Sequence, residues 1–290
     1  MNEGSGLVAG LDPAALEQFV SMTLAEDLGE GGDVTSALTV PAEARLRAKI
    51  ATRQDVVIAG VGLAEAFFRA TDPDVRINRL AQDGERLEAG TAILEIEGAG
   101  RAMLMAERSA LNTLQHLTGI ATLTRRYVDE IEGSGCTLLD TRKTIPGLRV
   151  IEKYATRVGG ATNHRMRLDD GILIKDNHIA IAGSLEDAVR RVVEGGSGLE
   201  VQVEVDLIQQ IEPALSAGAQ RLLCDNMPPD VLREAVRLVG GRVPIEASGG
   251  VRLDTIGEIA RTGVDFISVG RITQSAPAAD IGLDYAPIQS

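Results

Sequence analysis

The chain lacks tryptophan, has only two cysteines and is poor in aromatic residues, and each scarcity narrows its class. Aromatic residues make up 2% of the chain, and 42 Asp and Glu outnumber 29 Lys and Arg. A nucleic-acid-binding protein needs a basic face and stacking surfaces, so no nucleic-acid partner is expected. No apolar run approaches the roughly 18 to 20 residues of a membrane span, so no membrane partner is expected either.

Other absences concern compartment and chemistry. The amino terminus has no basic segment followed by an apolar one, so we expect no secretory signal and a cytoplasmic protein. Cys136 and Cys224 have no metal-site spacing and are expected to be reduced and buried. Residues Asp83–Gly98 are similar to half of a biotinyl or lipoyl carrier, but lysine is absent between Ile50 and Lys143. A carrier needs an exposed lysine in a hairpin, which excludes that function.

The 290 residues, 44% of them hydrophobic, suffice for one large domain and a smaller one. The sequence predicts an N-terminal α/β sandwich domain over residues 1–117. It begins with a helix from Pro13 to about Leu28, with Asp12 as N-cap and Gly29 past its end. Short alternating runs over residues 46–97 predict strands, with one helix at 62–70. A long helix over 102–132 links the domains, and residues of about 275–290 can pack back on the first.

Residues 118–290 predict an α/β barrel catalytic domain. Six short apolar segments are mostly separated by helical stretches, a pattern typical of right-handed βαβ units and a parallel sheet. Ser184 and Asp230 are expected to cap two of the helices. A seventh strand is possible near Val158, so the sequence predicts an incomplete (β/α) barrel. Active sites of such barrels lie at the carboxyl ends of the strands.

Cations gather at these strand ends although the chain carries a net charge of −13. Arginine grips a carboxylate with two prongs, and lysine supplies a compact charge. The pattern predicts a binding site for a small polyanion formed by Arg142, Lys143, His164, Arg165 and Lys175, to which Arg108 on the long helix could add.

Two further groups of residues indicate a phosphate-binding part and a metal-binding part of the same site. Ser248, Gly249 and Gly250 follow one strand and Gly270 and Arg271 the next, as in barrels whose last strand ends present backbone N–H groups to a phosphate. The acids Glu204, Asp225, Asp140 and Glu246 lie at comparable strand ends. They could hold Mg²⁺ through one or two carboxylates and substrate oxygens. The alternative is a set of structural salt bridges with Arg142, Lys143 or Lys175.

These residues fall within longer strings that resemble a known family. ERSALNTLQHLTGIAT, LDTRKTIPGLRVIEKYA, GGATNHR, LIKDNHI, VEVD, LCDN, EASGG and SVGRITQSAPAADIGLDY are similar to the corresponding segments of quinolinate phosphoribosyltransferases. The resemblance also includes GDVTS at 32–36 and covers nearly the whole chain.

The resemblance implies a reaction of quinolinate with phosphoribosyl pyrophosphate and Mg²⁺, giving nicotinate mononucleotide, pyrophosphate and CO₂ in NAD biosynthesis. It implies a homodimer or higher homo-oligomer, with Arg108 reaching the site of the neighbouring subunit. Lys143, Glu204 and Asp225 would be catalytic, and the two acids would hold the metal. Quinolinate would contact Arg108, Thr141, Arg142, Lys143, His164, Arg165 and Lys175. Phosphoribosyl pyrophosphate would contact Glu204, Asp225, Ser248, Gly249, Gly250, Gly270, Arg271 and Ile272.

Three positions depart from the family pattern: Arg167 stands for a glycine, Arg271 for a small residue and Gln274 for a histidine. They leave the dicarboxylate assignment intact and bear on the phosphate end. Three alternatives stay open. They are a paralogous phosphoribosyltransferase of unclear substrate, a Schiff-base lyase using Lys143 or Lys175, and a binding protein without turnover.

Overall fold

The computed structural model describes residues 11–287, with side chains described to residue 285. The chain divides into two compact units. Unit 1 comprises Met1–Leu123, Val150–Gly159 and Ala276–Ser290, and unit 2 comprises Thr124–Arg149 and Gly160–Ser275. No described helix is both long and apolar enough to cross a membrane. The expectation of no signal sequence concerns residues 1–10, which lie outside the described range.

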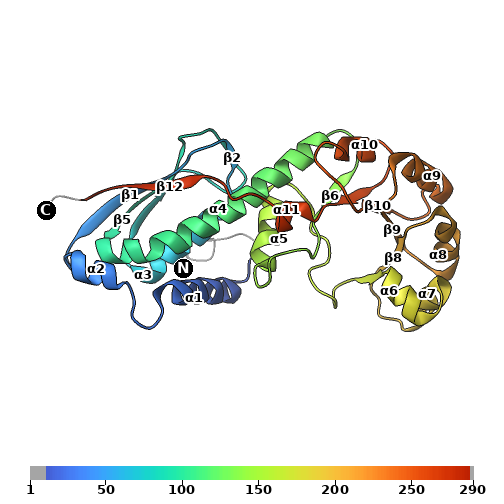
Figure 1. Ribbon diagram of the computed structural model, residues 1–290, viewed down its shortest axis with the longest axis horizontal. Helices are drawn as coiled ribbons and strands as arrows, with labels where there is room; N and C mark the ends of the chain where they lie inside the picture. The colour runs from blue at the N-terminus through green and yellow to red at the C-terminus, as the bar shows by residue number, and fades with distance from the viewer. Residues whose placement is uncertain (1–10, 288–290) are drawn as a thin grey trace, which may run out of the picture. The chain divides into compact units, whose positions relative to one another are not determined.

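Unit 1 is an antiparallel sheet with helices against it (Figure 1). The strand order is β12-β1-β5-β3, and β2 pairs separately with β4. The strands are β1 (Arg45–Thr52), β2 (Val56–Val57), β3 (Arg76–Arg79), β4 (Arg86–Leu87), β5 (Ala92–Ala99) and β12 (Ile281–Pro287). The helices are α1 (Pro13–Leu28), α2 (Val34–Thr39), α3 (Val61–Thr71), the first three quarters of α4 (Gly100–Glu130) and α5 (Arg149–Val158).

Alternation along β1 explains the two faces of this sheet. Ala48 and Ile50 are buried in a cluster with α3 and α4, whereas Arg47 and Lys49 are exposed. The predicted first helix is confirmed, with Asp12 accepting a hydrogen bond from the N–H of Ala14 (3.3 Å). The predicted long helix is confirmed as α4. The C-terminal strand β12, which pairs with β1, groups with unit 1.

Unit 2 is a six-stranded, all-parallel sheet in the order β6-β11-β10-β9-β8-β7. In Figure 1 the helices α7 (Leu185–Glu194), α8 (Ile211–Ala217) and α9 (Pro229–Val239) run along the outer side of the strands. The strands are β6 (Thr137–Leu139), β7 (Ile172–Ile174), β8 (Val201–Val205), β9 (Arg221–Asp225), β10 (Ile245–Ser248) and β11 (Phe266–Ser268). The helices are α6 (Asp176–Ala182), α7 (Leu185–Glu194), the 3₁₀ turn η1 (Ile208–Gln210), α8 (Ile211–Ala217), α9 (Pro229–Val239), α10 (Ile256–Ala260) and α11 (Arg271–Gln274).

This order makes the sheet an incomplete barrel, as predicted. The first strand, β6, pairs with the last, β11, so closure occurs there and the opening lies between β6 and β7. The strand considered near Val158 is wrong, since that residue ends helix α5. Only a single bridge from Leu139 to Thr162 partly takes its place.

Two smaller predictions, on the cap Asp230 and on the burial of Cys136, need correction. The predicted cap Ser184 is confirmed, because its side chain accepts a hydrogen bond from the N–H of Asp187 at the start of α7 (3.0 Å). Asp230 is not the N-cap, because α9 begins at Pro229 and its N-cap is Pro228, two residues before Asp230. Both cysteines are free, but only Cys224 is buried while Cys136 is half-buried. Burial raises the pKa of each thiol to about 12.

Gly119 allows the chain to return against α4 within unit 1. A Cβ atom at this position would lie 2.0 Å from the carbonyl oxygen of Pro277. Two hydrogen bonds to Gln115 hold the chain that follows Pro277, from the N–H of Ala279 to the Gln115 carbonyl (2.9 Å) and from the Gln115 amide to the Ile281 carbonyl (2.6 Å). Glycine at this helical position therefore serves packing.

We expect Gly119→Ala to lower the free energy of unfolding by about 1 to 3 kcal/mol, because the methyl group forces the Pro277 segment away. Helix propensity alone would give the opposite sign, a gain of about 1 kcal/mol. Chemical denaturation measures the difference. Asn112→Ala, at an exposed position of the same helix, is the control and should change stability by less than about 0.5 kcal/mol. A stabilised Gly119→Ala protein would contradict the packing role.

Candidate active site

A pocket of about 720 Å³ lies at the carboxyl ends of the parallel strands of unit 2. Six of its lining residues are lysine or arginine and two are acidic, so it is locally cationic in an acidic chain. The predicted site residues that it brings together are Thr141, Arg142, Lys143, His164, Arg165, Lys175, Asp225, Ser248, Gly249, Gly250, Gly270 and Arg271.

The strand register explains how the acidic and phosphate-end residues meet. Glu204 on β8 pairs with Leu223 on β9, which pairs with Glu246 on β10, and Asp225 pairs with Ser248. Residues two apart on a strand share a face, so all five lie on the same side of the sheet. Asp225 and Ser248 lie one layer closer to the carboxyl ends.

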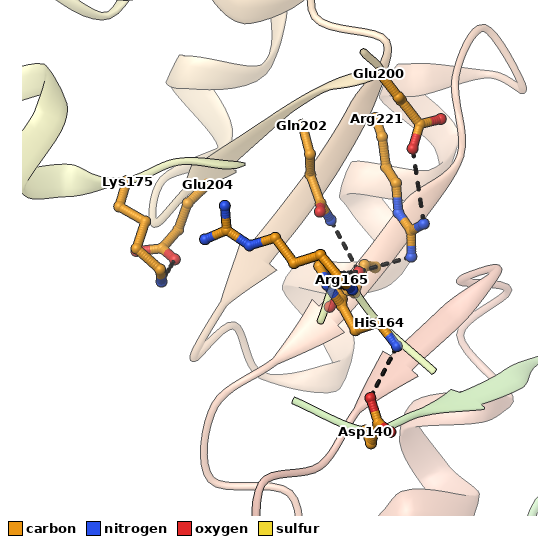
Figure 2. A network of polar contacts seen from close by, with 9 residues as sticks. Asp140, His164, Arg165, Lys175, Glu200, Gln202, Glu204 and Arg221 are labelled. Atoms are coloured by element: carbon orange, nitrogen blue, oxygen red, sulfur yellow. Dashed lines mark hydrogen bonds and ion pairs between the residues drawn. The ribbon is translucent and has the colours of Figure 1, made fainter. Parts of the chain in front are cut away.

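Asp140 joins the two loops that carry most of the cations. Its fully buried carboxylate follows β6 and accepts hydrogen bonds from the backbone N–H of His164 (2.8 Å) and the side-chain amide of Asn163 (2.5 Å). Figure 2 shows Asp140 next to His164, with Arg165 extending from the same loop. The DTRK and NHR motifs are therefore one structural unit, although 19 residues separate them in the sequence.

Arg149 fastens the same two loops from another side. Its guanidinium donates to Thr144 Oγ1 (3.1 Å), to the Met166 carbonyl (3.1 Å) and to the Arg142 carbonyl (3.5 Å). A planar group with five N–H donors can bond several acceptors in a fixed geometry, which a lysine cannot do.

Arg142 and Arg165 form the cationic centre of the pocket. Burial, and then the positive charge of Arg142, lower the pKa of Arg165. Arg165 Nη1 donates to the Gly171 carbonyl (2.9 Å), which fixes its direction. The buried Nε of Arg142 has no hydrogen-bond partner among the described residues. An anion placed between the two guanidinium groups would satisfy this donor and relieve their repulsion.

Lys175 and Glu204 form an ion pair at the edge of the pocket (Figure 2). Lys175 lines the pocket, while Glu204 is 7% exposed and lies behind it. A predicted dicarboxylate ligand and a predicted metal ligand thus neutralise each other here. The structural salt bridge considered from the sequence is real for this pair.

Glycine is required at two points of the phosphate end. Gly249 has a φ of +88°, and a Cβ there would lie 2.3 Å from Oδ1 of Asn226. A Cβ at Gly270 would lie 2.8 Å from Cδ of Lys143. Thr273 Oγ1 donates to the Lys143 carbonyl (2.7 Å) and so ties the loop after β11 to the DTRK motif.

Asp225 is one of the two acids that line the pocket. It is half-buried and accepts a hydrogen bond from the Asn226 amide (2.6 Å). No cluster of three or more His, Cys, Asp or Glu residues that could hold a metal is found among residues 11–285. One or two carboxylates suit Mg²⁺ only if substrate oxygens and water complete its coordination.

Three predicted residues do not line the pocket. Glu204 lies behind Lys175, and Ile272 is fully buried in α11. Arg108 belongs to unit 1, where its exposed side chain on α4 lies 3.9 Å from Glu107. Arg271 and Gln274, two departures from the family pattern, do line it, while Arg167 pairs with Asp169 at 2.8 Å on an exposed loop.

Sequence reasoning missed the residues that support the pocket. Arg149 and Asn163 stand inside the recognised strings, but no spacing rule predicts what they contact. Arg221 and Gln202 both bind the carboxylate of Glu246 (2.7 and 2.8 Å). Alternation along β8 and β9 places them on the inner face, which is the signal that could have found them.

Arg149→Lys is expected to loosen residues 142–148 and 163–167, because lysine cannot make the three hydrogen bonds at once. Faster amide hydrogen exchange in both segments, measured by mass spectrometry, is the predicted result. Arg167→Lys is the control, since Arg167 is exposed and bonds only within its own loop. Unchanged exchange in Arg149→Lys would show that Asp140 alone holds the loops.

Comparison with known proteins agrees with this geometry. Residues 33–118 match the model of the quinolinate phosphoribosyl transferase N-terminal domain, and residues 120–284 match that of its C-terminal domain. The nicotinate-nucleotide pyrophosphorylase [carboxylating] of Mycobacterium leprae is 41% identical over 277 residues, 93% of this chain and 97% of that protein. A probable enzyme of the same name from Bacillus subtilis is 38% identical and covers 93% of each chain.

A solved structure extends the agreement to three dimensions. The nicotinate-nucleotide pyrophosphorylase of Francisella tularensis superposes with a TM-score of 0.90 at 37% identity, covering 95% of this chain and 98% of the other. Both domain models, the curated relatives and the fold lead to one assignment. The chain belongs to the quinolinate phosphoribosyltransferase family.

Proposed function

We propose that the protein transfers the phosphoribosyl group of phosphoribosyl pyrophosphate to quinolinate with loss of CO₂. The products are nicotinate mononucleotide and pyrophosphate, and the step belongs to de novo NAD biosynthesis. The observation that carries the proposal is one pocket with two chemically different ends. Arg142 and Arg165 suit a dicarboxylate at one end, and the glycine loops at Gly249 and Gly270 suit a phosphate at the other.

The first step joins the two substrates. The bond from the anomeric carbon to pyrophosphate breaks, and its electron pair leaves with pyrophosphate. The ring nitrogen of quinolinate supplies the electron pair of the new N–C bond. Lys143 and Arg271, which line the pocket beside Gly270, would stabilise the developing negative charge. Orienting the nitrogen towards the anomeric carbon is the task of the arginines that hold the carboxylates.

Decarboxylation follows from the charge of the product ring. Once ribosylated, the ring nitrogen is cationic and lies beside the carbon that bears the 2-carboxylate. The C–C bond breaks, CO₂ leaves, and the electron pair stays on the ring carbon, which then takes a proton. Lys143 or a water molecule would deliver it. The protein must hold the 3-carboxylate firmly without overstabilising the 2-carboxylate ground state.

Magnesium fits the residues present. Asp225 would contact it in the pocket, and Glu204 would contribute if Lys175 turns to the incoming carboxylate. The ion would neutralise pyrophosphate oxygens. The pairing of Lys175 with Glu204 supports this exchange, since substrate and metal supply new partners for both charges.

The quaternary arrangement is also part of the proposal. A homodimer or higher homo-oligomer would bring Arg108 of a neighbouring subunit to the quinolinate site, and its exposed side chain on α4 is compatible with that role. The reaction would take place in the cytoplasm.

The Schiff-base lyase alternative is disfavoured for Lys175. An amine nucleophile is activated in an apolar pocket or beside another cation. Lys175 is instead paired with the carboxylate of Glu204. A covalent adduct at Lys143 or Lys175, trapped with borohydride in the presence of a carbonyl substrate, would favour the Schiff-base lyase instead.

The direct test measures nicotinate mononucleotide and CO₂ formed from quinolinate, phosphoribosyl pyrophosphate and Mg²⁺. Nicotinate replaces quinolinate in the control. Turnover of quinolinate alone supports the proposal. Turnover of nicotinate alone would reject the dicarboxylate site, and turnover of neither would lead to the paralogue or to a binding protein.

Arg165→Ala is expected to weaken quinolinate binding by about 2 to 5 kcal/mol, because a half-buried charge partner is removed. Phosphoribosyl pyrophosphate affinity should change much less. Titration calorimetry with each ligand measures both. The control Arg167→Ala removes an exposed arginine two residues away. An equal loss for both ligands would contradict the division of the pocket into two ends.

Asp225→Asn is expected to reduce Mg²⁺-dependent turnover by roughly ten- to hundredfold, the size of a lost charged interaction. Quinolinate affinity should stay close to that of the unaltered protein. Initial rates over a range of Mg²⁺ concentrations measure the effect. Asp206→Asn, at an exposed position after the neighbouring strand, is the control. A normal rate at saturating Mg²⁺ would remove Asp225 from the metal site.

A further inference from the structure

Glu246 is a buried acid that the mechanism above does not use. It lies on β10 at the floor of the pocket, and its side chain is fully buried. One carboxylate oxygen, Oε2, accepts from Arg221 Nη2 (2.7 Å) and Gln202 Nε2 (2.8 Å), contacts that Figure 2 draws. The other oxygen, Oε1, has no hydrogen-bond partner among the described residues.

The group is held as an anion. Burial by itself would raise the pKa of Glu246, but hydrogen bonding from His164, and then the charge of Arg221, lower it. Arg221 is itself fixed, because its guanidinium lies 4.0 Å from the ring centre of Phe266. A buried ion pair is weak evidence for stability, since apolar residues of similar volume often serve as well. Its position beside the pocket therefore calls for another explanation.

The explanation lies in which nitrogen of the His164 ring carries the proton. Nδ1 accepts a hydrogen bond from the backbone N–H of Arg165 (2.7 Å), so the proton of the neutral ring is on Nε2. Nε2 lies 3.5 Å from Oε2 of Glu246, at the outer limit of a hydrogen bond. The ring thus faces Glu246 through a donor that the carboxylate does not fully engage.

The unequal distances matter for ligand binding. Arg221 and Gln202 already satisfy Oε2 at short range, so Glu246 loses little when the Nε2 proton turns to another acceptor. A carboxylate oxygen of a bound ligand is such an acceptor, and His164 lines the pocket. The ring can then change partner without leaving a buried charge uncompensated.

We propose that Glu246 is a positioning residue that acts through His164. Anchored by Arg221 and Gln202, it keeps the imidazole in the Nε2–H form and presents that N–H to a carboxylate of the dicarboxylate substrate. This role rests on the proposed function for its ligand, but the state of the ring is a property of the protein alone.

The test uses Glu246→Gln in the full-length protein, which keeps the shape and removes the charge. Arg221 and Gln202 would hold the glutamine carbonyl oxygen in the place of Oε2, so the variant keeps an acceptor there but loses the negative charge that favours the Nε2–H form. We expect quinolinate to bind roughly tenfold more weakly, with the KM for phosphoribosyl pyrophosphate changed less than twofold. Nitrogen NMR of His164 without ligand should show Nε2 protonated in the unaltered protein and a mixture of forms in the variant.

Two controls separate positioning from a general loss of stability. Glu152→Gln removes the fully buried carboxylate that contacts His116 at 2.8 Å in unit 1. It should lower thermal stability and leave quinolinate affinity unchanged. In a His164→Gln background, Glu246→Gln should weaken quinolinate binding little further, because residues that act through one another are not additive.

The outcomes distinguish this inference from the proposed function. If the unaltered protein binds quinolinate and Glu246→Gln binds it equally well, the positioning role is overturned and the function stands. Equal losses for both substrates, or additive losses with His164→Gln, would reduce Glu246 to a structural residue. Failure of the unaltered protein to bind quinolinate would overturn the function and the substrate-presenting role together.

Discussion

The site depends on one constraint: several cations must be held close together without a ligand between them. Repulsion between Arg142 and Arg165 opposes this arrangement. Burial is the main cause of the lowered pKa of Arg165, and the positive charge of Arg142 lowers it further. Asp140 offsets it by accepting hydrogen bonds from the loop that carries His164 and Arg165. A buried carboxylate thus organises the cations from behind while leaving their donors directed at the pocket.

Acids and their partners occupy three successive layers of the parallel sheet. Asp225 lies at the carboxyl end, Glu204 and Glu246 lie one layer below, and Arg221 and Gln202 lie below them. Each buried acid has a cationic or amide partner, as burial of charge requires. The partners differ in how easily they can be exchanged. Arg221 is fixed on Phe266, whereas Lys175 is 40% exposed and can leave Glu204.

Much of the fold could be predicted because local patterns decided it. The helix Pro13–Leu28 has its cap, its proline and its terminal glycine in sequence. The six parallel strands have apolar runs bounded by polar residues. The failures occurred where neighbours decided. Two prolines set the start of α9 before Asp230, and Val158 lies at the end of the ten-residue helix α5, not in a strand.

The sequence by itself determined the composition of the site: which cations, which acids and which glycines are available, and that they follow strands of a parallel sheet. It also determined the family, because the motifs are long and ordered. Only the tertiary structure decided which of these groups are partners. Lys175 is held by Glu204 and His164 faces Glu246 because strand register and loop closure set distances between residues far apart in the chain. Spacing along a sequence carries no such distances, so ligand and support residues could not be told apart before folding.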